Sequence, residues 1–282
     1  MNNQFKLNDY KQQIADMYSH RSHNYDESEW HTRITHRLVE FAQIGSGQQV
    51  LDIATGTGHI AIEVAQIVGS SGRVVGVDIS TGMLDQARCK VEALNLSNVE
   101  LILADAEALS FPANSFDRIL CANSFPWIAD MEAALRQWMR LLKPGGLIGI
   151  HTPAETAYVV EVVLRELFEK YGVMLASSKP AGTVEKCHNL LERAGFEAIE
   201  IQSEQYGGSY ISLEQAKQQW TGNSYPGFVQ FSNRQSPLSS EQLEQVKAEF
   251  YAQLEALATE LGIWNDGTQF FVVGRKSADS IS

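Results

Sequence analysis

Three aspartates come at or near the ends of three short apolar runs in the first half of the chain. Asp52 lies in VLDI, Asp78 ends VVGVD, and Asp105 ends VELILAD. Each run has the length and composition of a buried strand, and segments with helical periodicity or turn residues separate them. Because the carboxyl ends of parallel strands meet at one edge of a sheet, where ligands bind, we expect three carboxylates around one crevice.

A glycine-rich turn follows Asp52 and leads into a predicted helix. Residues 54–61 read ATGTGHIA, so Gly56 and Gly58 satisfy the pattern G-x-G-x-x-A. Such a turn often brings backbone N–H groups close to the pyrophosphate of a dinucleotide. Asp52, immediately before the turn, would repel a phosphate, and no lysine follows Gly58 as in a P-loop. A nucleoside with a cationic amino-acid tail and no phosphate fits this arrangement better.

S-adenosylmethionine is such a ligand, since it carries an ammonium, a sulfonium, a ribose diol and an adenine. We expect Asp52 to compensate the ammonium, Asp78 to accept from both ribose hydroxyls, and Asp105 to accept from the adenine amino group. Glycines in the turn let the backbone approach the tail. The remaining adenine contacts are expected from Ile79, Met83 and the Ala106 N–H, with ordinary core packing as the alternative for Met83.

Four segments resemble the class I S-adenosylmethionine-dependent methyltransferases, closest to the ubiquinone/menaquinone-type and related small-molecule enzymes. These are VLDIATGTG, VVGVDIS, LADAEALSFPANSFDRI and LLKPGG, all within about residues 48–150. The resemblance implies S-adenosylmethionine as cofactor. It also implies cofactor contacts at Asp52, Ala54, Gly56, Asp78, Ile79, Asp105 and Ala106, at Asn123 just beyond the fourth strand, and at Tyr25, which matches an aromatic that closes over the cofactor.

Strands and helices alternate over residues 50–151, which indicates a parallel sheet with helices on both faces. A further strand is expected at 268–275, after an interval of about sixty residues that is too long for a plain connection. We predict an α/β fold with a doubly wound, mostly parallel seven-stranded sheet whose last strand is antiparallel. The predicted parts are an N-terminal helical cap (1–45), a Rossmann-like core (46–205 and 268–276) and a helical lid (206–267).

Aromatic residues near the predicted crevice suggest an apolar acceptor. Phe125 and Trp127 follow the fourth strand, and Tyr18 lies in the cap. Trp220 and Tyr225 lie in the predicted lid, so they are further candidates for contact with the substrate. We therefore expect an acceptor site lined by Tyr18, Phe125, Trp127 and Trp220.

Composition argues against nucleic acid and membrane partners. The chain has 22 Lys and Arg against 34 Asp and Glu, a net charge of −12. Proteins that bind the phosphates of nucleic acids usually present a basic face instead. No apolar run reaches about 18 residues, and the N-terminus lacks the apolar segment of a secretory signal. The three cysteines lack ligand-like spacing. We expect no metal and a cytoplasmic location.

A general base is less clearly marked than the cofactor site. His151 ends the predicted fifth strand at the same edge of the sheet, and His20 is one of four histidines in residues 20–36. Both are candidate bases, because an unperturbed imidazole titrates near pH ~6.5. The alternative is a solvated histidine on a helix surface.

The expected function is in-line methyl transfer to a small aromatic or apolar metabolite, with O-methylation slightly favoured. Holding the reacting atoms in line can contribute about 7–11 kcal/mol, so the lack of an obvious base does not argue against catalysis. C-methylation of a quinone-type ring and a non-catalytic S-adenosylmethionine-binding regulatory module are the alternatives. Either a monomer or a homodimer is compatible with the sequence.

Overall fold

Seven strands form one sheet in the order β3-β2-β1-β4-β5-β9-β6 in the computed structural model, which describes residues 7–173, 179–220 and 238–279. The first five in this order pair in parallel, and β9 pairs antiparallel with both β5 and β6. The predicted mostly parallel sheet with an antiparallel last strand is confirmed. The strands are β1 (Gln49–Ile53), β2 (Arg73–Asp78), β3 (Val99–Leu103), β4 (Phe116–Cys121), β5 (Leu142–Pro153), β6 (Glu197–Gln205) and β9 (Thr268–Arg275).

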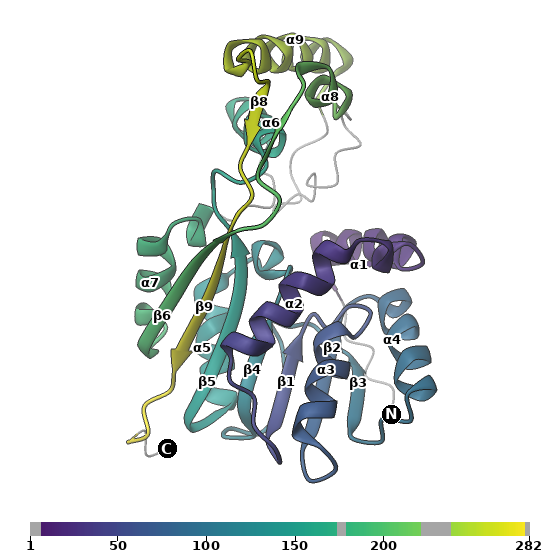
Figure 1. The fold of residues 1–282 in the computed structure, drawn as a ribbon, viewed down its shortest axis with the longest axis vertical. Coiled ribbons are helices and arrows are strands. Elements are labelled where there is room, and N and C mark those ends of the chain that lie inside the picture. The colour runs from purple at the N-terminus through teal and green to yellow at the C-terminus, as the bar shows by residue number, and fades with distance from the viewer. Residues whose placement is uncertain (1–6, 174–178, 221–237, 280–282) are drawn as a thin grey trace.

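Helices cover both faces of this sheet (Figure 1). Apolar residues occur on both sides of the central strands, as expected where a parallel sheet is buried between two helical layers. Leu51 and Ile53 of β1 pack in one core with Trp138, while Val50 packs in the other with Leu38. The first core takes residues from α5 (Met131–Leu141) and α7 (Val184–Arg193), and the second from α2 (Glu29–Phe41) and α3 (His59–Val68).

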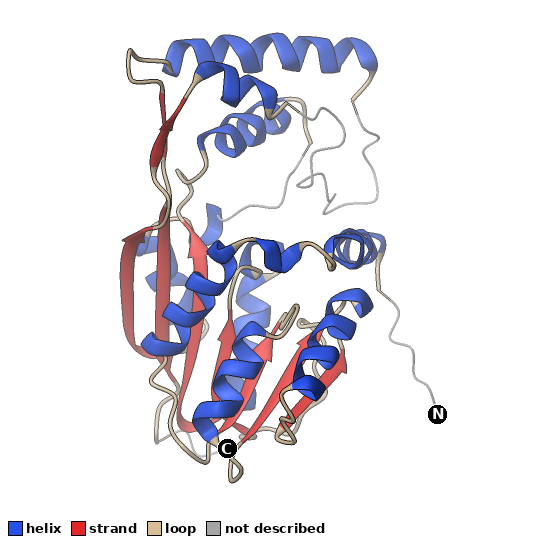
Figure 2. Cartoon of the chain, turned by 45° about the vertical axis from the view of Figure 1, so that its right-hand side comes forward, coloured by secondary structure: helices blue, strands red, loops and turns tan. Residues whose placement is uncertain are grey.

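The chain changes direction across the sheet between β1 and β4. β2 and β3 lie on one side of β1, and β4 and β5 continue on the other. A crevice at the carboxyl ends of the strands forms at such a switch point. Helix α1 (Asp9–Arg21) lies across this end of the sheet beside α4 (Thr81–Ala93), as Figures 1 and 2 show. Two short 3₁₀ turns, η1 (Tyr25–Glu27) and η2 (Phe125–Trp127), complete the rim.

A smaller helical unit stands beyond the upper end of β5, β6 and β9 and is joined to them by a narrow neck (Figure 2). We use the term helical unit for α6 (Val159–Lys170), β7 (Ser209–Ile211), α8 (Leu213–Gln218), α9 (Ser240–Leu257) and β8 (Ile263–Asn265). These elements share a hydrophobic core of their own that contains Phe168 and Phe250. The predicted lid covered residues 206–267. In the structure, its described helices share their core with α6, which lies outside that range.

Tyr225, which was predicted to lie in the lid, is outside the described residues. No helix within residues 7–173, 179–220 and 238–279 is both long and apolar enough to cross a membrane.

Candidate functional site

A cavity opens at the carboxyl ends of β1, β2 and β3, where the sequence predicted a crevice. Its lining includes eleven of the predicted site residues: Tyr18, Tyr25, Ala54, Gly56, Asp78, Ile79, Met83, Asp105, Ala106, Asn123 and Trp127. A smaller cavity adjoins it, shares part of this lining and adds Asp52 and His31. The three aspartates therefore surround one connected region.

Asp52 projects from β1 into the interior beside the smaller cavity. Its side chain is almost completely buried, and one carboxylate oxygen accepts a hydrogen bond from Thr55 Oγ1 at 2.5 Å. Burial raises the pKa of Asp52 to about 7, although the bond from Thr55 acts in the opposite direction. A buried carboxyl group with such a pKa gains its charge readily when a cation binds next to it.

Asp78 ends β2 and holds the glycine turn in place. Its two carboxylate oxygens accept hydrogen bonds from the Gly56 N–H at 2.9 Å and the Ser80 N–H at 2.8 Å. Burial raises the pKa of Asp78, and the backbone donors oppose this rise. The side chain is therefore fixed in orientation while it lines the larger cavity.

The two glycines of the turn have different roles. Gly56 has φ +57°, and an added Cβ would find only the Ala54 carbonyl oxygen, at 4.0 Å, so the space beside it is open for a ligand. Gly58 has φ +87° and lines neither cavity, and an added Cβ would lie 3.2 Å from Ala87 Cβ. Gly58, predicted to contact the cofactor, instead permits the close approach of α3 to α4.

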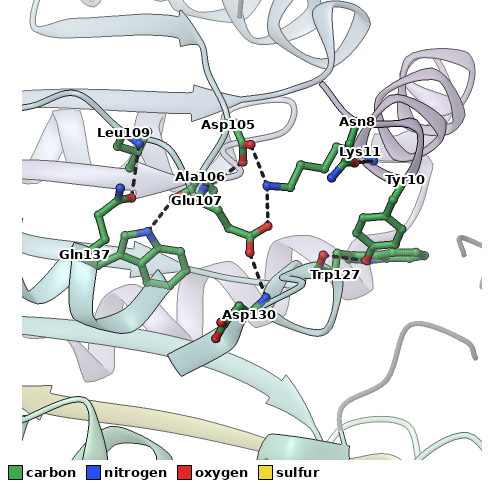
Figure 3. Close-up of polar contacts among 11 residues, drawn as sticks. Asn8, Tyr10, Lys11, Asp105, Ala106, Glu107, Leu109, Trp127, Asp130 and Gln137 are labelled. Carbon is green, nitrogen blue, oxygen red and sulfur yellow. Dashed lines mark hydrogen bonds and ion pairs between the residues drawn. The ribbon is translucent and has the colours of Figure 1, made fainter. Parts of the chain in front are cut away.

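Lys11 of α1 reaches the far rim of the larger cavity (Figure 3). Its ammonium lies 2.7 Å from a carboxylate oxygen of Asp105 and 2.7 Å from one of Glu107, and all three side chains are largely buried. The Glu107 carboxylate also accepts from the Asp130 N–H at 3.0 Å. Burial lowers the pKa of Lys11, but its hydrogen bonds to Asp105 and Glu107 raise it above its usual value. This ion triad fastens α1 to the loop after β3.

Further contacts hold α1 over the cavity. The Tyr10 hydroxyl donates to the Trp127 carbonyl oxygen at 2.8 Å, and the hydroxyls of Ser19 and Ser80 lie 2.8 Å apart. A Cβ added at Gly82, near the start of α4, would lie 2.9 Å from Ser19 Cα. The helix therefore packs directly on the N-terminal turn of α4.

Aromatic rings form one side of the cavity. Tyr18 makes edge contacts with Trp127 and Tyr25, with ring centroids 5.9 and 6.2 Å apart, and Tyr25 packs on His31 at 4.2 Å. Burial raises the pKa of Tyr18 to about 12, so its hydroxyl stays protonated at neutral pH. These rings stand at steep angles to one another, with interplanar angles of 66° and 88° for Tyr18 on Tyr25 and Trp127, and they give the cavity an aromatic wall.

Two buried polar atoms at the smaller cavity have no hydrogen-bond partner within the described chain. They are His31 Nδ1 and Asn123 Oδ1. Buried polar atoms are rarely left unpaired, because this costs about 1–3 kcal/mol. Together with Asp52, which lines the same cavity, they are available to hydrogen-bond a ligand.

Five of the predicted site residues do not line either cavity. Besides Gly58, they are His20, which is exposed on α1, His151, Phe125 and Trp220. Phe125 is buried against Trp138, because the 3₁₀ turn directs Phe125 into the core and Trp127 toward the cavity. Trp220 stacks on Phe168 inside the helical unit.

His151 is completely buried and lies behind the cavity wall. Its Nδ1 accepts from the Asn123 N–H at 3.3 Å, and its Nε2 lies 2.9 Å from Gln269 Oε1. Burial lowers the pKa of His151 to about 4, so the imidazole is neutral and weakly basic.

Four residues of the site were not predicted: Lys11, Glu107, Asp26 and the particular histidine His31. Asp26 accepts from Thr57 Oγ1 at 2.6 Å, lies 2.8 Å from His59 Nε2 and pairs with Lys90, so it holds the glycine turn from the side of η1. Lys11 shares one helical face with residues 14 and 18, and this spacing is the only sequence signal for it. No group of three His, Cys, Asp or Glu arranged for a metal occurs in the part of the chain that the structure describes.

Known proteins with similar sequences identify the family. Residues 50–146 match the model of a methyltransferase domain. Aklanonic acid methyltransferase from Streptomyces sp. (strain C5) is 31% identical over 199 residues, which cover 66% of this chain and 87% of that protein. The chain belongs to the class I S-adenosylmethionine-dependent methyltransferases. S-adenosylmethionine is therefore its methyl donor, and its acceptors are small molecules.

Other relatives of the methyltransferase match a shorter stretch. A ubiquinone/menaquinone biosynthesis C-methyltransferase from Cronobacter sakazakii is 42% identical over 117 residues, which cover 39% of this chain and 47% of that protein. The chain thus spans about half the length of that relative. Two solved structures share the fold: a [4+2]-cyclase (TM-score 0.57, 20% identity, 95% of this chain and 97% of that one) and Haemonchus contortus phosphoethanolamine N-methyltransferase 2 (TM-score 0.57, 19% identity, 96% and 61%).

The ion triad at Lys11 gives a direct test of how α1 is held on the methyltransferase. Lys11→Met keeps an unbranched side chain that is one atom shorter, and it leaves Asp105 and Glu107 without their cation. We expect backbone hydrogen exchange in Asp9–Arg21 to become roughly 10- to 150-fold faster, since hydrogen bonds to charged groups contribute about 1.5–3 kcal/mol. Gln12→Ala, on the exposed side of the same helix, is the control, and equal exchange in the two variants would contradict this role.

Proposed function

We propose that this methyltransferase methylates a small aromatic or apolar metabolite, with an oxygen acceptor favoured. The observation that carries the proposal is the aromatic side of the larger cavity, where Tyr18, Tyr25 and Trp127 lie in the same cavity as Asp78 and Asp105. A flat acceptor can stack on such rings, because aromatic pairs prefer offset or edge contacts.

The cofactor-binding roles are proposed residue by residue. Asp52, Asn123 Oδ1 and His31 would hold the amino-acid end in the smaller cavity, where the first turn of α3 favours a carboxylate. Asp78 would accept from the ribose hydroxyls beside Gly56, and Tyr25 and Ala54 would border the same region. The proposed contacts to the adenine are those of Ile79, Met83, Asp105 and Ala106.

Catalysis is proposed to rest on positioning and on exclusion of water. The bound cofactor supplies an electrophilic methyl group. Neither predicted base, His20 or His151, lines a cavity, and Tyr18 keeps its proton, so the chain's own contribution would be to align the acceptor. α1 covers the cavity from one side, and the helical unit, which contains the described helices of the predicted lid, is proposed to cover the acceptor from another.

C-methylation of a quinone-type ring is the second candidate. The feature that favours it is the likeness to a ubiquinone/menaquinone biosynthesis C-methyltransferase, which is 42% identical over 117 residues. The aromatic side of the cavity would suit such a ring equally well.

Asp52 makes cofactor binding dependent on pH. Only the charged carboxylate compensates the ammonium, and burial raises the pKa of Asp52 to about 7. As pH rises from 5.5 to 7.5, the affinity for S-adenosylmethionine should therefore increase about tenfold or more. Isothermal titration calorimetry measures this, and Asp52→Asn, which is neutral throughout, should bind weakly with a flatter profile. An unchanged profile in the variant would show that another group is responsible.

The acceptor class is tested with a methyl donor labelled on its methyl group. The protein is incubated with labelled S-adenosylmethionine and a panel of phenols, carboxylic acids, quinols and amines, and the products are analysed by mass spectrometry. We expect label on an oxygen of an aromatic acceptor. Label on a ring carbon would favour the second candidate, and label only on amines would contradict the proposal.

A further inference from the structure

Within the residues that the structure describes, three segments cross between the sheet and the helical unit and form the neck. The outgoing segment follows β5 at residues 154–158, a second follows β6 at 206–208, and the return segment at 266–267 leads into β9. Figure 2 shows how narrow this connection is. Interactions among these segments therefore contribute to the position of the helical unit relative to the cavity.

Backbone hydrogen bonds tie the three crossings together. The Tyr158 N–H donates to the Asp266 carbonyl oxygen and the Tyr206 N–H to the Gly267 carbonyl oxygen, both at 2.9 Å. A Cβ added at Gly267 would lie 2.5 Å from the Tyr206 carbonyl oxygen, so the strands of the neck are in close contact. Tyr158 itself has φ +61° and caps the start of α6. A displacement of one crossing would therefore displace the others.

A chain of buried side chains runs from this neck to the cofactor site. Gln269 Nε2 donates to the Tyr158 hydroxyl at 3.0 Å and to the Gly267 carbonyl oxygen at 3.2 Å. Its Oε1 accepts from His151 Nε2, and His151 Nδ1 accepts from the Asn123 N–H. Both Gln269 and His151 are completely inaccessible to solvent.

The donors and acceptors of these hydrogen bonds can be assigned in one way. Gln269 uses its amide N–H groups on the neck, so its oxygen must accept from His151. His151 must then be the neutral tautomer with hydrogen on Nε2, which leaves Nδ1 free to accept from Asn123. Fully paired buried networks of this kind favour a single geometry. Trp30 packs edge-on against both His151 and Tyr158, with ring centroids at 6.1 and 6.4 Å.

We infer that Gln269 and His151 are positioning residues that couple the cofactor site to the orientation of the helical unit. Asn123 is the link at the cofactor end, because its backbone N–H is held by His151 while its unpaired Oδ1 faces the cavities. A ligand that engages Asn123 thereby orders the neck, and an ordered neck holds the helical unit over the acceptor. This inference rests on the proposed function, in which the helical unit covers the acceptor.

Hydrogen exchange with S-adenosylhomocysteine as the probe tests the coupling without an acceptor. In the wild-type protein, saturating probe should slow exchange in Val159–Lys170 and Ile263–Asn265 about fivefold or more, a usual size for coupling between sites. In Gln269→Leu, calorimetry should still detect binding of the probe while this response disappears. Gln205→Ala is the matched control, since Gln205 hydrogen-bonds Asp266 and Thr268 at the same neck but does not touch His151.

Tyr158→Phe is a milder second variant that removes only the hydroxyl at the outer end of the chain. It should reduce the response in Val159–Lys170 and leave binding of the probe detectable, so the test stands even if Gln269→Leu does not fold. A full response in either folded variant, or a lost response in Gln205→Ala, would overturn the coupling. Binding without any response in the wild type overturns the coupling alone, whereas no binding at all overturns it together with the proposed function.

Discussion

The arrangement of the site depends on one constraint, which is that parallel strands on either side of a switch point end at the same edge of the sheet. β1 pairs with both β2 and β4, so Asp52, Asp78 and Asn123 are brought to one place although they are far apart in the chain. The Asp78 carboxylate is then fixed by the N–H groups of Gly56 and Ser80, and that of Asp52 by Thr55 Oγ1, whereas Asn123 Oδ1 is left for a ligand. The cavity is a consequence of strand order more than of any single side chain.

Burial gives these acids their chemical character. A carboxylate in a dry environment is costly, so burial raises the pKa values of Asp52 and Asp78. A cationic ligand without phosphate relieves this cost, whereas a pyrophosphate would increase it. At the opposite rim, Lys11 already forms ion pairs with Asp105 and Glu107. The carboxyl groups that a cationic ligand would compensate are therefore those of Asp52 and Asp78.

The sequence predicted the sheet and most of the cavity lining because both follow from local patterns. Buried strands with an Asp at or near the end, a turn with Gly56, and helices after β1, β2 and β4 are visible within short windows. It did not predict the partners that α1 brings from a distance, such as Lys11 on Asp105, because nothing local fixes where a helical cap lies. Phe125 and Trp127 were treated alike, and only the observed 3₁₀ turn separates the ring buried in the core from the ring that lines the cavity.

The helical unit was the least predictable part. Its short strands β7 and β8 pair with each other. Helix α6, which the sequence assigned to the core, packs with α9, which lies about seventy residues later in the chain and beyond β6. His151 is a related case: a histidine at a strand end has the chemistry of a base, but its burial behind Asn123 depends on β9 lying beside β5.

A crystal structure of the complex with S-adenosylhomocysteine tests the central claim most directly. The account predicts both ribose hydroxyls on the Asp78 carboxylate and the ammonium beside Asp52 and Asn123 Oδ1. A nucleoside bound elsewhere, or one whose amino-acid end points away from Asp52, would contradict it.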